Sequence, residues 1–298
     1  MEIERRYQAF EALSFGLVPK SVLKFNLYGL RKLEKSFHLD NLDFLYDVLT
    51  NIEGINKKYL RLCRTFADFL QLSILEVDDT LDHLPKTDME TLASESMKAL
   101  NPVIFFNSMM SELERNPENL DRFAKAVKSY LKSVGDLFNT PVEYIKNRDG
   151  YLKANSKQEE YDRLATTQIL RGSHLRVYFY PCVYIIDPQP LRKEIERLAY
   201  LAERTRGIGL LRKDIYDRKD DLKYGNYNAI NLIVSKYSDS ANLNSIVCRD
   251  IASVGRMLLE DVIKNANDVR KKYRRSAKNL IKKAEESIVD LEENLERF

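Results

Sequence analysis

Two clusters of aspartates are the residues of this sequence best suited to chemistry. They are Asp78, Asp79 and Asp82 in the first cluster and Asp214, Asp217 and Asp221 in the second. If both segments are helical, each acid lies within about one turn of the next acid in its cluster, where like charges repel. Mg²⁺ relieves such repulsion because it prefers carboxylate oxygen. Each cluster therefore indicates a metal site, with a charged surface helix as the alternative.

The second cluster also contains cations between its acids. Lys213, Arg218, Lys219 and Lys223 lie in the same segment. Carboxylates that hold metals, next to cations that hold phosphate oxygens, are what a metal–phosphate site requires. Gly225 and the asparagines after it predict the end of the helix. The two clusters lie about 135 residues apart, and a helical bundle can bring two such faces together across a central cavity.

These motifs resemble those of class I terpene synthases of the single-domain microbial type. The stretch Asp78–Asp82 matches the family's D-D-x-x-D motif, and Lys213–Asp221 lies in the register of its N-D-x-x-S-x-x-x-E motif. Leu222, Gly225, Asn226 and Asn228 continue the second motif. The sequence departs from the family at Lys213, where the family has a metal-binding Asn. Asp217 and Asp221 replace its Ser and Glu, and both keep an oxygen ligand.

The resemblance implies an all-α helical bundle around a central cavity and an enzyme, a carbon–oxygen lyase of isoprenoid biosynthesis. Its reaction would be the Mg²⁺-dependent ionisation and cyclisation of a linear prenyl diphosphate, farnesyl or geranylgeranyl diphosphate. That family uses three Mg²⁺ ions with the diphosphate, and Mn²⁺ is a possible substitute.

The implied metal ligands are Asp78, Asp79, Asp82, Asp214, Asp217 and Asp221. The implied diphosphate-binding residues are Arg171, Arg218 and Lys219, with Arg171 as the pyrophosphate sensor and Arg163 and Arg176 as its rivals. The apolar cavity would be lined by Phe66, Phe69, Phe105, Phe106, Tyr178 and Tyr180, each of which could equally be ordinary core.

Two other functions stay open at this level. A prenyl-chain-elongating synthase shares the implied fold, although Tyr28–Lys32 is a poor match to that family's Gly-Lys-Arg region. A non-catalytic α-helical interaction protein is the other alternative. Its anionic partner would bind the basic stretch Lys264–Lys283, which contains nine basic residues and one acid, Asp268. The remainder, 284–298, is acidic, and a solvated helix with differently charged halves explains the same pattern.

Helices are the elements expected to position these residues. Gly (10) and Pro (8) are scarce among 298 residues, and the chain divides into helical stretches separated by short polar breaks. The breaks include Asn139–Pro141, Asn147–Gly150, Asp187–Pro190 and Ser238–Asn244. The most strand-like stretch is Val177–Ile186, but Pro181 in its middle argues against a strand. We expect one α-helical domain over 1–298, with a charged C-terminal helix over 264–298.

Composition limits the class of protein further. The 48 basic and 45 acidic residues give a net charge of +3, so no nucleic-acid partner is expected. The three cysteines form no disulfide framework, which favours a reducing, cytoplasmic location. The N-terminus is too charged for a secretory signal, and no apolar run reaches the length of a transmembrane helix. A homodimer is an open alternative to a monomer.

Overall fold

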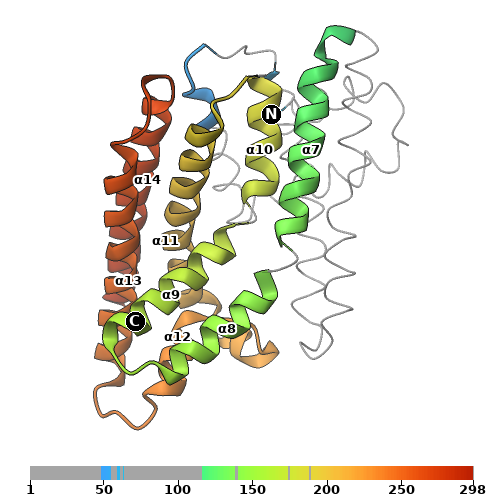
Figure 1. Ribbon diagram of the computed structural model, residues 1–298. Coiled ribbons are helices and arrows are strands. Elements are labelled where there is room, and N and C mark those ends of the chain that lie inside the picture. The colour runs from blue at the N-terminus through green and yellow to red at the C-terminus, as the bar shows by residue number, and fades with distance from the viewer. Residues whose placement is uncertain are drawn as a thin grey trace, which may run out of the picture. The chain divides into compact units, whose positions relative to one another are not determined.

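The computed structural model describes residues 48–54, 59–60, 63, 116–137, 140–173, 175–187 and 189–297. In these ranges every regular element is a helix, which confirms the predicted all-α class. The helices are η1 (Pro117–Asn119), α7 (Leu120–Leu137), α8 (Thr140–Lys153), α9 (Lys157–Gly172), α10 (Leu175–Ile186), α11 (Arg192–Tyr224), α12 (Ala229–Lys236), α13 (Leu243–Ala266) and α14 (Lys271–Leu295) (Figure 1). None of the helices in these ranges is both long and apolar enough to cross a membrane.

The chain divides into two compact units. Unit 1 comprises Met1–Thr50, Gly54–Val134 and Val177–Pro190, and unit 2 comprises Asn51–Glu53, Gly135–Arg176 and Leu191–Phe298. A helical domain can itself contain two compact halves, so the single domain expected over 1–298 stays a prediction.

In unit 1, helix α10 occupies the stretch that looked most like a strand. Residues 175–186 form a helix that contains Pro181, and no strand forms there. Val177, Cys182 and Val183 are fully buried, so the hydrophobic run reflects a helix buried on most sides. Pro181 has no amide N–H to donate within the helix, yet burial of this apolar helix stabilises it.

Buried polar contacts join α10 to other parts of unit 1. Arg122 of α7 donates to the Ile185 carbonyl oxygen at 2.5 Å, and its guanidinium lies over the Tyr59 ring. The Cys63 thiol donates to the Cys182 carbonyl oxygen at 3.4 Å. Both of these cysteines are free and buried. Burial raises the pKa of the Cys63 thiol, so it is not a reactive thiolate at neutral pH.

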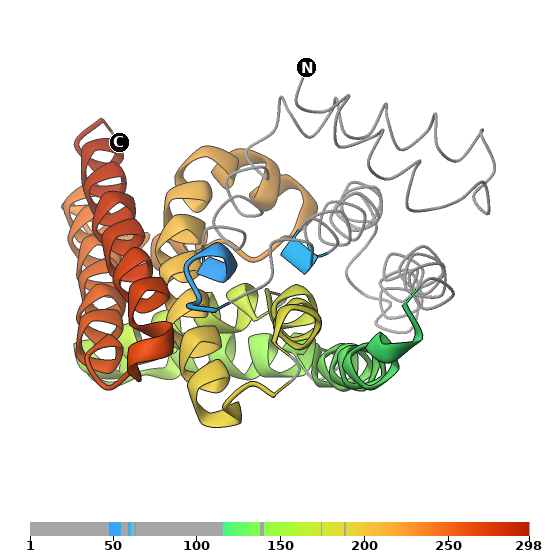
Figure 2. The ribbon, with the colours of Figure 1, turned by 90° about the horizontal axis from the view of Figure 1, so that it is seen from above.

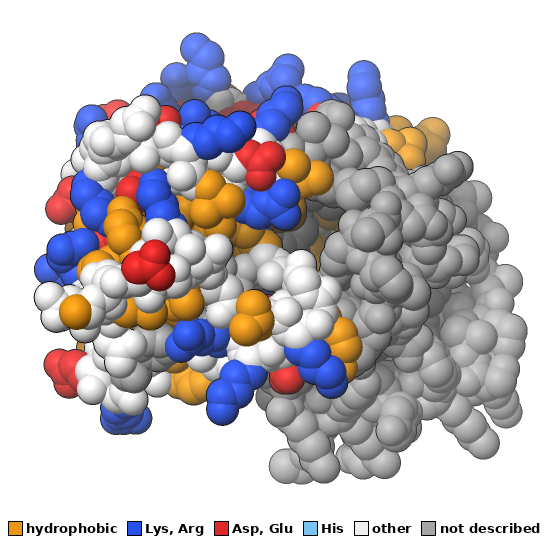
Figure 3. Space-filling view, turned by 90° about the horizontal axis from the view of Figure 1, so that it is seen from below, with side chains coloured by type: hydrophobic (Ala, Val, Ile, Leu, Met, Phe, Trp, Pro, Cys, Tyr) orange, Lys and Arg blue, Asp and Glu red, His pale blue; other side chains and the backbone are white. Residues whose placement is uncertain are grey.

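Unit 2 is organised around the long helix α11. Helices α9, α12, α13 and α14 all pack against it, and α8 packs against α9 (Figures 1 and 2). Leu198, Leu201, Ile208 and Leu211 of α11 are fully buried. These side chains recur at helical spacing and form the core of the unit. The face of the molecule seen from below carries Lys and Arg side chains among hydrophobic ones (Figure 3).

Gly172 allows close approach between two helices of unit 2, because a Cβ atom there would lie 2.8 Å from the Glu203 carbonyl oxygen. At Gly150, a Cβ atom would meet the flexible end of the Arg163 side chain, with Nε at 2.9 Å. Helix α8 continues through Gly150 to Lys153, and the break expected at 147–150 was wrong. A single glycine within a helix costs about 1 kcal/mol relative to alanine and need not end the helix.

A polar network holds the start of α9 against two other helices. Lys157 Nζ donates to Glu160 at 2.7 Å, to the Tyr237 hydroxyl at 2.7 Å and to Asp250 at 2.9 Å. Glu160 and Asp250 are buried, and buried carboxylates require such partners. The network therefore joins α9 to α13 and to the end of α12.

The charged C-terminal segment is not one helix from residue 264. Helix α13 ends at Ala266, and α14 begins at Lys271 after a turn. Burial of Val269 (1% exposed) and Tyr273 (fully buried) anchors this turn against the core. Helix α14 carries the basic residues from Lys271 onward and most of the acidic stretch, and its buried face includes Leu280, Ala284 and Leu291.

We predict opposite effects on stability for two Gly→Ala substitutions in unit 2. Gly172→Ala places a Cβ against a backbone oxygen of α11 and should lower the free energy of unfolding by about 1–3 kcal/mol. Gly209→Ala has room, with Arg206 Nη1 at 3.9 Å as its nearest neighbour, and should raise it by about 0.5–1 kcal/mol. Urea unfolding followed by circular dichroism measures both values, and equal effects would refute the close approach of α9 to α11.

Candidate functional site

The second acidic cluster lies on α11, as predicted, but its members are in different environments. Asp214 is fully buried. Arg171 of α9 donates from Nη1 to both Asp214 oxygens, at 2.8 and 3.0 Å. The structure therefore brings together two residues that the sequence predicts to be in one site, 43 positions apart.

Further donors surround the Asp214 carboxylate. Gln168 donates from Nε2 at 3.1 Å, and the backbone N–H of Ala229 donates at 3.0 Å. Gln168 also accepts from Arg171 Nη1 at 2.9 Å. Burial would lower the pKa of the Arg171 guanidinium, but the facing Asp214 carboxylate outweighs it, and the net direction is upward. Arg171 is thus held charged and in a fixed orientation.

The end of α11 forms as the sequence predicts. Gly225 has φ of +69° and terminates the helix, with its N–H bonded to the Asp221 carbonyl oxygen. Glycine is the usual residue at this position, because it adopts the left-handed backbone conformation without steric cost. Asn228 then caps α12, because its side-chain oxygen accepts from the N–H groups of Ile230 and Asn231. These caps fix the sharp turn that places Ala229 N–H against Asp214.

Asn228 also connects the turn to the acidic cluster. Its Nδ2 donates to the Asp214 carbonyl oxygen at 2.8 Å and to Asp221 Oδ2 at 2.8 Å. One amide therefore caps a helix and positions a carboxylate of the preceding helix. The side chain is 2% exposed.

Asp217 lies between Asp214 and Asp221 in sequence and is half-buried. Lys213 forms a 3.5 Å ion pair with it. Burial raises the pKa of the Asp217 carboxyl, and the nearby Asp221 raises it further, while Lys213 acts in the opposite direction. The like charges of these two neighbouring carboxylates repel, and a bound cation would reduce that repulsion.

Arg171 is the predicted arginine that contacts this cluster directly. Of its two rivals, Arg163 lies 3.9 Å from Glu159 and Arg176 pairs with the buried Glu203. Arg171 Cζ lies 5.3 Å from the centroid of the Tyr227 ring. Tyr227 in turn stacks on Tyr144, with ring centroids 6.5 Å apart. The guanidinium is therefore next to a stacked pair of aromatic rings.

The other predicted cations occupy the outer side of α11. Arg218 Nε donates to Asn231 Oδ1 at 3.3 Å, which ties this side chain to α12. Lys219 is exposed. Both lie in the turn of α11 that carries Asp217 and Asp221, but residues two positions apart on a helix do not face each other, so Lys219 points away from the two carboxylates.

The remaining predicted site residues are placed as follows. Tyr178 is buried in α10 of unit 1, and Tyr180 is half-buried with its ring in an edge-on contact with Phe179. The first acidic cluster and the predicted phenylalanines lie outside the described residues: Asp78, Asp79, Asp82, Phe66, Phe69, Phe105 and Phe106.

Three residues of the site were missed by sequence analysis. Gln168 lies one turn before Arg171 on α9, so helical spacing could have found it. Tyr144 and Tyr227 gave no signal, because their contacts depend on how α8 packs and how the chain turns after Gly225. Among the described residues, no three Asp, Glu, His or Cys side chains are grouped as ligands of one metal ion. Asp217 and Asp221 are at most one side of such a site.

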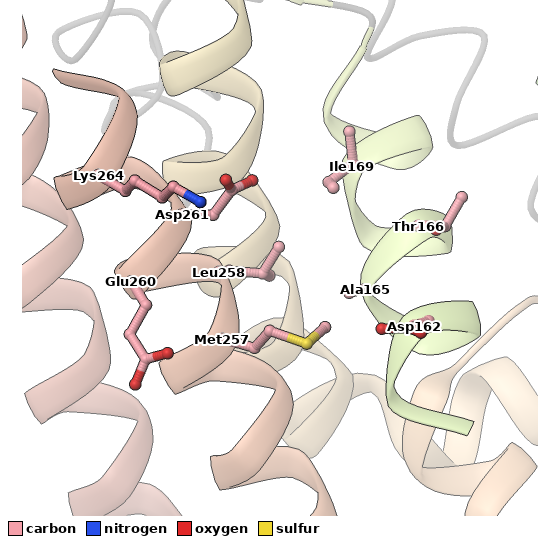
Figure 4. Close-up of a pocket in the computed structure, with 9 residues that line it drawn as sticks. All are labelled: Asp162, Ala165, Thr166, Ile169, Met257, Leu258, Glu260, Asp261 and Lys264. Atoms are coloured by element: carbon pink, nitrogen blue, oxygen red, sulfur yellow. The ribbon is translucent and has the colours of Figure 1, made fainter. Parts of the chain in front are cut away.

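A separate surface groove of about 440 Å³ lies between α9 and α13 (Figure 4). It is lined by Asp162, Ala165, Thr166, Ile169, Met257, Leu258, Glu260, Asp261 and Lys264. At one end, Asp261 accepts from Tyr200 at 2.7 Å and pairs with Arg204 of α11. None of the predicted site residues lines this groove.

Comparison of the chain with protein-family models, with curated protein sequences and with solved structures gave no match.

We predict that two Asp→Asn substitutions on α11 have different effects on stability. Asp214→Asn leaves the buried Arg171 charge without its counter-charge and should lower the free energy of unfolding by about 3–5 kcal/mol. Asp217 has a raised pKa in the folded state, so its ionisation opposes folding as the pH rises through that pKa. Asp217→Asn should therefore leave stability unchanged or raise it at neutral pH.

Urea titrations of both variants at neutral and at acidic pH test this contrast. The difference between Asp217→Asn and the unsubstituted chain should shrink at acidic pH, where both are neutral at this position. A large loss of stability in Asp217→Asn at neutral pH would contradict the assignment of Asp217 to a ligand-binding position.

Proposed function

We propose that the chain is a class I terpene cyclase, a Mg²⁺-dependent lyase that ionises and cyclises a linear prenyl diphosphate. The arrangement that supports this most is the buried Arg171–Asp214 pair beside the carboxylates of Asp217 and Asp221. It places a fixed positive charge next to two acids whose mutual repulsion a bound cation would reduce. A metal-bound diphosphate has the complementary charges.

The acids divide into two roles on this proposal. Asp217 and Asp221 would hold Mg²⁺ from α11, and Asp78, Asp79 and Asp82 are proposed as the ligands of the other cluster. Mg²⁺ in such a site neutralises the negative charge of the departing diphosphate. Asp214 was predicted as a metal ligand, but its oxygens already accept from Arg171, Gln168 and Ala229. We therefore assign Asp214 to holding Arg171 in position.

The cations would bind the diphosphate itself. Arg171 is pre-oriented by Asp214 and Gln168, so little reorganisation is needed when an anion binds. Arg218 and Lys219 add charge from the outer side of α11. The rings of Tyr144 and Tyr227 bound this region with aromatic surface, and such surface favours an allylic cation over water. Phe66, Phe69, Phe105 and Tyr178 remain the residues proposed to line the apolar cavity.

A binding experiment tests the site separately from catalysis. Mg²⁺ with inorganic pyrophosphate should raise the melting temperature of the chain, since a ligand at 100-fold its dissociation constant adds about 2.7 kcal/mol. Asp217→Ala and Asp221→Ala should abolish most of this shift. Asp220→Ala is the matched control, because it removes an exposed acid beside the proposed ligands and should keep the shift. A shift unaffected by all three variants would contradict the assigned ligands, and no shift would favour the non-catalytic interaction protein.

A product experiment tests the reaction. Incubation with geranyl, farnesyl or geranylgeranyl diphosphate and Mg²⁺ should give a cyclic hydrocarbon or alcohol by gas chromatography–mass spectrometry, and EDTA should abolish it. A longer prenyl chain formed only with isopentenyl diphosphate would identify the elongating synthase instead.

Lys213→Asn should keep or increase turnover, because it restores a neutral oxygen ligand. A folded but inactive Lys213→Asn variant would show that Lys213 has a role of its own.

A further inference from the structure

The outward face of α14 carries a charge pattern that is complementary to itself. The side chains directly opposite the buried face recur at spacings of three and four residues, and all are exposed. They are Lys271, Arg275, Lys278, Lys282, Glu285, Glu286, Val289, Glu293 and Glu296. The first four are basic, and all of the rest except Val289 are acidic.

This order of charges does not stabilise the helix that carries it. The N-terminus of a helix is the positive end of its dipole and favours acids, whereas the C-terminus favours bases. Helix α14 has no acidic residue in its first turn and no basic residue in its last turn. Its charges are therefore arranged against the dipole, and an explanation must be sought outside the helix.

The other described elements do not account for the pattern either. The acids of α14 that pair with neighbouring helices lie on its flanks, where Asp290 pairs with Arg212 of α11 and Glu292 with Arg256 of α13. Within the described part of the chain, the ion pairs of the outward face are confined to Lys282 with Glu286, at 3.5 Å. Figures 1 and 2 show α14 beside α13 at the outer side of unit 2.

We propose that α14 is the contact surface of a homodimer in which two copies of this helix pack antiparallel about a two-fold axis near residues 283 and 284. This arrangement places Arg275 opposite the partner copy's Glu293 and Lys271 opposite its Glu296. Lys282, next to the axis, faces Glu285 and Glu286. Because the axis is two-fold, each of these contacts occurs twice.

The same arrangement opposes the two helix dipoles and covers Val289, which is 55% exposed, with the methylene groups of Lys278. Exposed ion pairs are individually weak and are screened by salt. The dimer should therefore be a weak one that forms at low ionic strength and dissociates when salt is added. The proposal does not depend on the proposed function of the chain.

Sedimentation velocity over a range of protein concentrations, at low and at high salt, measures the association. Arg275→Glu or Glu293→Arg alone should raise the dissociation constant by about tenfold or more, because each creates two like-charge contacts. The double variant, Arg275→Glu with Glu293→Arg, should restore dimerisation. Lys128→Glu reverses an exposed charge on α7 and serves as the control that should leave the dissociation constant unchanged.

The readout distinguishes loss of the contact from loss of the fold. Both single substitutions change α14 towards the charge order that its dipole favours, so the melting temperature of the dilute protein should stay the same or rise. A chain that is monomeric at low salt at every concentration would overturn the proposal. So would a dimer that tolerates both single substitutions, or a double variant that is no better than the singles.

Discussion

The buried ion pair between Arg171 and Asp214 is the contact on which the arrangement of the site depends. A buried carboxylate without partners is costly, so the surrounding chain must supply donors in fixed places. Gln168 on α9 and the Ala229 N–H at the start of α12 meet that requirement. Three helices are thus held at one point by one carboxylate. That junction also positions the outer acids of α11, Asp217 and Asp221. Their carboxylates are not part of the Arg171–Asp214 pair.

The junction also explains why glycine and asparagine occur where they do. Gly172 lets α9 approach the backbone of α11, directly after Arg171. Gly225 turns the chain back sharply, and Asn228 starts the next helix within three residues. Without both features, the Ala229 N–H could not face a carboxylate three turns earlier on α11. Local backbone chemistry and the buried charge pair therefore specify the same geometry.

The sequence predicts the helical class and the faces of its helices better than their contacts. Aspartates at 214, 217 and 221 had to share one face of a helix, and Gly225 had to end it, because both follow from local periodicity and local backbone freedom. The burial of Asp214 could not be predicted, since it depends on α9 and α12 meeting there. The apolar stretch 177–186 looked ambiguous for a related reason. A helix buried on most sides loses the amphipathic period and resembles a buried strand, and only Pro181 argued against a strand there. Gly150 resembled a loop signal, although α8 continues through it.

Asn228 holds the Asp221 side chain and the start of α12 through different atoms. The Nδ2 group bonds both Asp221 and the Asp214 carbonyl oxygen, while Oδ1 alone serves the first amides of α12. Rotation of the Asp221 side chain would break one hydrogen bond to a carboxylate, at a cost of about 1.5–3 kcal/mol, and leave the cap and the Asp214 bond in place. The first amides of α12 would then stay bonded to Asn228 Oδ1 whichever way this carboxylate points.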